Sequence, residues 1–224
     1  MNSTDAPQPQ GFFGWTKRQW LIGAALFVSY LAAVYLAHLV APESNLILPG
    51  MAIAITALFF AGIELWPVLL SATLVASFVS GASPLTLLVL PAGETLQAVL
   101  GAYLLRRAEI DPLFRKFRDI FFLFIIVLAV AVITPTLESL THVLSAAMNH
   151  TVASIPSWSY HYTASVFALI ILTPFLLRWF AKPRFSRTWI EAMETGGVFL
   201  LLLVTDYLLF IVGVTNVGSI PLVY

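Results

Sequence analysis

The sequence contains no cysteine, and only 10% of its 224 residues are charged. The absence of cysteine excludes a disulfide, a thiolate metal site and a cysteine nucleophile. A soluble domain of this size carries roughly a quarter charged residues, so the low charge argues against a soluble protein. Eleven basic residues balance eleven acidic residues, and this zero net charge indicates no nucleic-acid partner.

Familiar enzyme motifs are also missing from the sequence. It has no glycine-rich phosphate-binding loop, no G-x-S-x-G nucleophile motif and no H-E-x-x-H zinc motif. The loops between apolar runs are short and leave no room for a second folded domain. We therefore expect no catalytic activity, no cofactor and no metal.

Apolar residues make up 60% of the chain and gather in runs long enough to cross a bilayer. A transmembrane helix needs about 20 consecutive, mostly apolar residues. The sequence thus predicts an all-α integral membrane protein that contacts the lipid bilayer. The first run, 20–41, is longer than the apolar part of a secretory signal. We interpret it as the first span, residues 1–19 as an N-terminal tail, and 20–224 as one polytopic domain.

The lysines and arginines fall in three groups, which the positive-inside rule assigns to the cytoplasm. This assignment predicts a multi-pass protein of the bacterial inner membrane with a cytoplasmic N-terminus. It also requires an even number of spans between consecutive groups. The groups are Lys17 and Arg18; Arg106, Arg107, Arg115, Lys116 and Arg118; and Arg178, Lys182, Arg184 and Arg187.

Seven apolar runs satisfy this requirement. The second and third are short, and Pro49-Gly50 interrupts the second, so a re-entrant hairpin is an alternative that preserves the orientation. Seven spans leave the last residues outside just as another apolar run begins. We expect the chain to be a segment of a longer protein that lacks its last span, with a natural stop as the alternative. The runs are 20–41, 46–62, 65–79, 85–105, 120–134, 163–180 and 193–213.

Three polar residues lie deep within these spans. Glu94 precedes Arg106 by twelve residues, which is about 18 Å along a helix, and Asp206 lies at a similar depth in the last run. A carboxylate at that depth costs a few kcal/mol and usually faces the bundle interior. Gln97 shares the helix face of Glu94 at i+3. These residues are candidates for ligand binding, and a hydrogen bond between helices is the alternative.

A second candidate pair is Glu138 and His142, spaced i, i+4 on the outer continuation of the fifth span. The two side chains could hold one cation or share a proton. Ordinary polar residues at the membrane interface are the alternative. His38, His150 and His161 also fall at outer ends of spans, which makes the histidine pattern unspecific.

Three sequence blocks resemble, in order and spacing, those of the first-type MASE domain, a membrane-associated sensor at the N-terminus of bacterial signalling proteins. GETLQAVLGAYLLRR (93–107) is similar to the family's N-T-L-E-A-L-L-G-A-Y-L-L-R-R block. PGMAIAITALFFAGIELWP (49–67) is similar to its A-G-I-A-L-A…F-G…L-W-P block, and LIILTPFLLRW (169–179) to its L-L-L-T-P-L-L-L block. The resemblance runs from about Trp20 to the end of the chain.

The sequence departs from these blocks at several polar or aromatic positions. Glu94 replaces the family's asparagine, Gln97 replaces its glutamate, and Ser165 replaces the aspartate of its W-L-G-D-A-L-G block. Residues 46–48 replace its W-P-P. The resemblance therefore implies no particular ligand.

The resemblance implies a sensor, usually of about eight spans, whose last helix leads to a cytoplasmic histidine kinase, PAS or diguanylate cyclase domain. We expect a sensory and localising module that detects an unknown small ligand and signals to such an output domain in cis. A homodimer is compatible with this role. A small solute-binding transporter component is the alternative, suggested by polar residues in mid-membrane near a Gly/Pro-interrupted span. An intramembrane hydrolase would require Glu94 and Asp206 to pair.

Overall fold

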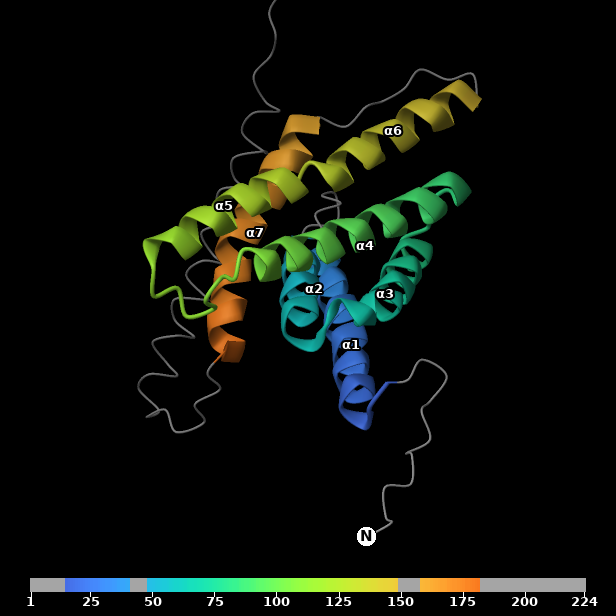
Figure 1. Ribbon diagram of the computed structural model, residues 1–224. Coiled ribbons are helices and arrows are strands. Elements are labelled where there is room, and N and C mark those ends of the chain that lie inside the picture. The colour runs from blue at the N-terminus through green and yellow to red at the C-terminus, as the bar shows by residue number, and fades with distance from the viewer. Residues whose placement is uncertain (1–14, 41–47, 149–157, 182–224) are drawn as a thin grey trace, which may run out of the picture. The chain divides into compact units, whose positions relative to one another are not determined.

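The computed structural model describes residues 15–40, 48–148 and 158–181. Within these ranges the chain forms seven α-helices and a short 3-10 helix, and contains no β-strand (Figure 1). The predicted all-α class is confirmed for this part of the chain. The helices are α1 Lys17–Val40, α2 Leu48–Ala61, η1 Ile63–Leu65, α3 Trp66–Val79, α4 Pro84–Arg107, α5 Phe117–Val130, α6 Ile133–Met148 and α7 Trp158–Ala181.

Four stretches of the described residues are long and apolar enough to cross a membrane: Gln19–Ala37, Pro84–Arg107, Phe117–Met148 and Trp158–Ala181. The third stretch joins α5 and α6. The fifth run was expected to leave the membrane around residues 134–135, but α6 continues the apolar stretch for more than three further turns.

The helices α2 and α3 are joined by the short η1 turn into a hairpin, and each of them packs against α1 and α4. Each has 14 residues, which gives about 21 Å of helix, less than the roughly 30 Å of a bilayer core. Gly62 ends α2 with φ +119°, a conformation that side chains with a Cβ rarely adopt. The count of seven spans is therefore not confirmed. The run 193–213 and Asp206 lie outside the described residues.

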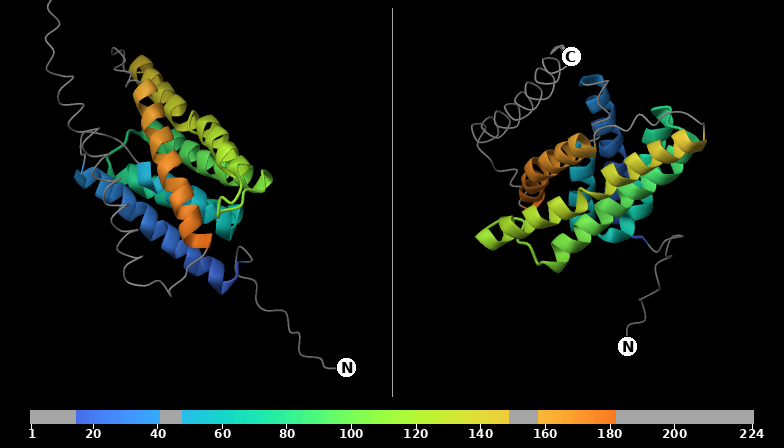
Figure 2. Two further views of the ribbon diagram at one scale, coloured as in Figure 1. Left: turned by 90° about the vertical axis from the view of Figure 1, so that its left-hand side faces the viewer. Right: turned by 90° about the horizontal axis from the view of Figure 1, so that it is seen from above.

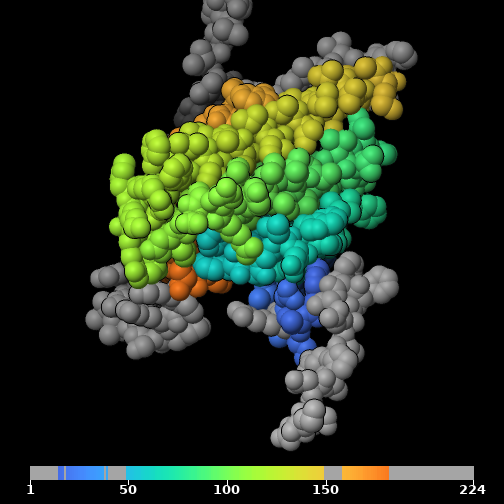
Figure 3. All heavy atoms as spheres, viewed as in Figure 1, coloured from blue at the N-terminus to red at the C-terminus, as the bar shows by residue number. Residues whose placement is uncertain are grey.

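The helices pack around α4. This helix contacts α2, α3, α5 and α6, while α7 packs against α2, α5 and α6. Figure 1 shows α5 and α6 following one another along α4, and Figure 2 shows the same pairing from two further sides. In the space-filling view, α3, α4 and the α5–α6 pair form successive bands across one face (Figure 3).

Small residues allow these helices to approach closely. Ala72 of α3 and Ala98 and Ala102 of α4 are fully buried, as their helical spacing predicts. At Gly93 of α4, an added Cβ would overlap the side chain of Leu137 on α6. Glycine at this position thus sets the distance between α4 and α6.

Large apolar side chains face outward along the bundle. Phe117 and Phe121 on α5 are exposed, as are Leu21 and Val28 on α1. Such surfaces suit the hydrocarbon of a bilayer, in which the helical backbone satisfies its own hydrogen bonds. The packing therefore agrees with a membrane-embedded bundle.

Candidate functional site

Basic residues mark one end of the bundle, which we call the cationic end. Arg106, in the last turn of α4, donates from Nε to the Phe59 carbonyl of α2 over 2.8 Å, and Nη2 donates to the same oxygen. Arg178 of α7 donates to the Leu113 carbonyl in the loop before α5 over 3.2 Å. The ends of α2, α4 and α7 and the loop 108–116 therefore meet at one side.

The start of α1 lies at the cationic end as well. Gln19 Nε2 donates to Glu64 Oε2 in the α2–α3 turn over 3.3 Å. Lys17 thus belongs to the same end as Arg106 and Arg178. The packing brings together the described members of the three basic groups, as the charge pattern predicts.

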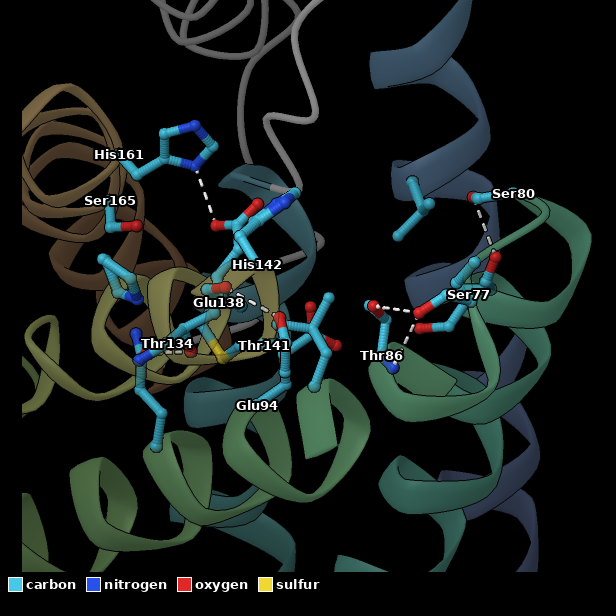
Figure 4. A pocket seen from close by; sticks show the side chains of 18 of the residues that line it. Ser77, Ser80, Thr86, Glu94, Thr134, Glu138, Thr141, His142, His161 and Ser165 are labelled. Atoms are coloured by element: carbon cyan, nitrogen blue, oxygen red, sulfur yellow. Dashed lines mark hydrogen bonds and ion pairs between the residues drawn. The ribbon is translucent and has the colours of Figure 1, made fainter. Parts of the chain in front are cut away.

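A cavity of about 380 Å³ lies toward the opposite end (Figure 4). It is lined by the second half of α1, the beginning of α2, the end of α3, the first half of α4, and side chains of α6 and α7. Its volume falls in the range of about 300–1,000 Å³ typical of small-molecule pockets. Glu94, Gln97, Glu138 and His142 all line it.

Glu94 is the most deeply buried carboxylate of the cavity, with 1% of its surface exposed. The hydroxyl of Tyr30 on α1, itself fully buried, donates to Glu94 Oε2 over 3.0 Å. A buried charge or polar group is tolerated where such a partner exists. The interior orientation expected from the cost of a lipid-facing carboxylate is therefore what the structure shows.

Gln97 closes a break between two helices. Helix α5 ends at Val130 and α6 begins at Ile133, which leaves backbone groups without partners in the ladder. Gln97 Oε1 accepts from the backbone N–H of Thr134 over 3.2 Å and from its hydroxyl. A side chain of α4 thus caps the N-terminus of α6, so the structure contains the interhelical hydrogen bond that was one of the two explanations for Gln97.

A second side chain closes the same break from the opposite side. Tyr162 on α7 donates its hydroxyl to the carbonyl of Leu128, near the C-terminus of α5, over 3.3 Å. Unpaired backbone groups in a bilayer cost several kcal/mol each, because no water is present to replace the lost partner. The break between α5 and α6 is therefore supported by both α4 and α7.

Glu138 links α6 to α7. His161 Nδ1 lies 2.9 Å from Glu138 Oε2, and both side chains are mostly buried (Figure 4). The sequence pointed instead to His142 as the partner, because it lies one turn away on the same helix. The first turn of α7 packs against α6 and supplies the partner from another element. Among the described residues, no three histidine or carboxylate side chains converge on one metal site.

The remaining polar groups of the cavity are hydroxyls. Ser77 and Ser80 come from the end of α3, Thr86 from the start of α4, and Ser165 from α7. Ser83 caps the N-terminus of α4, where its side chain accepts from the Thr86 N–H over 3.3 Å. The lining of the cavity therefore combines carboxylates, imidazoles and hydroxyls with apolar side chains.

The MASE1 family model matches residues 13–223, nearly the whole chain. The chain belongs to the MASE1 family. This is a family of membrane-associated sensor domains, so the resemblance seen in the three sequence blocks is confirmed. No curated protein and no solved structure matches the chain.

Three of the departures from the MASE1 sequence blocks line one cavity. Glu94 and Gln97 lie on α4 and Ser165 on α7, and all three line it. The resemblance places an asparagine, a glutamate and an aspartate at these positions. This MASE1 domain therefore carries its carboxylates in a different arrangement from the pattern of those blocks.

Sequence reasoning missed two members of the site, Tyr30 and His161. Tyr30 follows Lys17 by thirteen residues and Glu94 precedes Arg106 by twelve, so the two side chains lie at the same depth from the cationic end. Comparing these depths would have paired them. The sequence gives no comparable signal for the contact between His161 and Glu138. The sequence before α7 does not predict at which depth in the membrane this helix begins.

Proposed function

We propose that this MASE1 domain detects a small polar molecule in the cavity and passes the signal to a cytoplasmic output domain. One observation carries the proposal: polar side chains of α3, α4, α6 and α7 meet in one cavity that lies away from the cationic end. Membership of a sensor family supports the sensory role. The output is a histidine kinase, PAS or diguanylate cyclase domain in cis, and the chain itself performs no catalysis.

The proposed orientation follows from the positive-inside rule. The cationic end faces the cytoplasm of a bacterial cell, and the cavity faces the outer side of the inner membrane. Residues 1–19 form the cytoplasmic tail, and 20–224 form the sensor domain. The run 193–213 supplies a further span, and a homodimer is compatible with this arrangement.

Helix α7 is the element best placed to transmit the signal. At the cavity, His161 joins it to Glu138 of α6, and Trp158 Nε1 donates to Thr136 Oγ1 over 3.1 Å. At the cationic end, Arg178 of the same helix holds the Leu113 carbonyl. A ligand bound in the cavity beside Glu138 changes the α6–α7 contact and thereby the position of α7 at the cytoplasmic side.

The proposal is tested by joining the domain to its output domain, or to a diguanylate cyclase reporter, in cells. Ser165→Phe fills part of the cavity, and Glu138→Gln removes the charge that faces His161. Each is expected to change basal output by at least about fivefold, the lower end of typical allosteric coupling. Glu109→Gln makes the same chemical change at an exposed loop position and serves as the matched control.

The membrane level of each variant is measured in parallel by immunoblotting. Wild-type output from both cavity variants at normal protein levels would contradict the sensory role of the cavity. A flux of solute through proteoliposomes, with output unaffected, would favour the transporter alternative instead.

A further inference from the structure

The charge pattern of the cavity identifies the class of ligand. Among the described residues, two carboxylates, Glu94 and Glu138, line it, and no lysine or arginine does. The basic side chains of the described helices belong to the cationic end, where Arg106 and Arg178 bind backbone carbonyls. An anionic ligand entering the cavity would meet these two carboxylates, and among the described lining residues only the imidazoles of His142 and His161 could offset them.

The two carboxylates differ in their partners. Glu138 faces the imidazole of His161, which balances its charge when protonated. Glu94 receives a hydrogen bond from the neutral hydroxyl of Tyr30, and within the described ranges no basic side chain forms an ion pair with it. A buried carboxylate without a cationic partner is costly, and a positively charged ligand supplies that partner.

The hydroxyls of the cavity indicate how the ligand donates hydrogen bonds. An ammonium group offers three donors and no acceptor. The oxygens of Glu94 and of Ser77, Ser80 and Thr86 are acceptors on the cavity wall. A bare metal ion fits less well, because the described residues offer no group of three strong ligands. An organic ammonium also fills a cavity of about 380 Å³.

We propose that the cavity binds a small organic primary amine, with its ammonium group on Glu94 and its remaining atoms among the serine and threonine hydroxyls of α3 and α4. This inference rests on the proposed role of the cavity as the sensing site. It narrows the signal to one chemical class, a cationic amine that reaches the cavity from the outer side.

The test uses the purified chain in lipid nanodiscs and three probes with the same four-carbon skeleton. These are 1,4-diaminobutane, 1,4-butanediol and succinate, which carry positive, neutral and negative ends. Binding is measured by isothermal titration calorimetry. The diamine is expected to bind more tightly than the diol by roughly ten- to a hundredfold, the value of a hydrogen bond to a charged group, and succinate is expected to give no heat.

Variants of Glu94 separate charge from shape. Glu94→Gln keeps an oxygen acceptor for Tyr30 and removes the charge, so diamine affinity should fall by at least about tenfold. Glu94→Asp keeps the charge and should retain binding more closely than the glutamine variant. Glu109→Gln should bind as the wild type does. Thermal unfolding of each unliganded variant shows whether the variant is folded. If the glutamine variant is unstable, the affinity of the aspartate variant for the diamine still tests the role of the charge.

Each outcome bears on the proposal. Equal or tighter binding of butanediol or succinate, lost in Ser165→Phe, would overturn the amine class and leave the cavity as a ligand site. Absence of heat with all three probes would also overturn the amine class. Only wild-type reporter output from both Ser165→Phe and Glu138→Gln would remove the proposed function itself, so the two failures are distinguishable.

Discussion

Replacing Gln97 with leucine removes the cap of α6. Leucine is apolar and of similar size, so insertion into the membrane is not impaired. The change deprives the Thr134 N–H and hydroxyl of their shared acceptor. The hydroxyl can turn to a carbonyl in the preceding turn, as those of Thr136 and Thr163 do, but the N–H has no such option.

The expected loss therefore comes mainly from one unsatisfied backbone donor. Leaving a buried donor without a partner costs about 1–3 kcal/mol, whereas hydrogen bonds between membrane helices average about 0.6 kcal/mol in double-mutant cycles. The donor is a fixed backbone group at a helix terminus, so we expect the larger figure. Gln97→Leu should lower the free energy of unfolding by about 1–3 kcal/mol.

The measurement is reversible unfolding in mixed micelles, followed by circular dichroism. Gln97→Asn keeps an uncharged amide, whose oxygen is an acceptor, and should lose less stability than the leucine variant. Tyr162→Phe releases the Leu128 carbonyl at the same break and should cost about 0.5–1.5 kcal/mol. A leucine variant as stable as the wild type would refute the capping role.

Three further predictions concern orientation and packing. The chain has no cysteine, so a single introduced cysteine is its only thiol. An impermeant thiol reagent applied to intact cells should modify Met148→Cys and should not modify Lys116→Cys. The reverse pattern of labelling would overturn the proposed orientation. Gly93→Ala should cost about 1–3 kcal/mol through overpacking in the same unfolding assay, and Leu137→Ala should restore part of that loss if the overlap is its cause. Gly62→Ala should cost about 1–3 kcal/mol through backbone strain, and an unchanged unfolding midpoint would show that the turn relaxes.

The helices and their burial could be predicted because their signals are local. Apolar runs located α1, α4 and α7 closely, and the cost of a lipid-facing carboxylate predicted the burial of Glu94. The distribution of basic residues also predicted which helix ends share a side. Each of these inferences depends either on residues close together in the sequence or on the apolar interior and the charge rule of the membrane.

The partners within the site could not be predicted in the same way. Tyr30 and Glu94 are 64 residues apart, so periodicity within a helix does not pair them, and only their equal depth from the cationic end links the two. For Glu138, the local pattern indicated His142, while packing of α7 supplied His161. The sequence around Pro135 is compatible with an exit from the membrane and also with a break between two helices inside it. In either case, polar and helix-breaking residues follow an apolar run.

The hydrogen bonds from Arg106 to α2 have a consequence for the insertion of the protein into the membrane. The Phe59 carbonyl is held by Arg106, a residue translated 47 positions later. The α2–α3 hairpin is too short to span the bilayer by itself, and all of it is translated before Arg106. Its final depth can therefore be fixed only after α4 has been inserted. Truncations that stop between the hairpin and Arg106 should leave it exposed to membrane quality-control proteases.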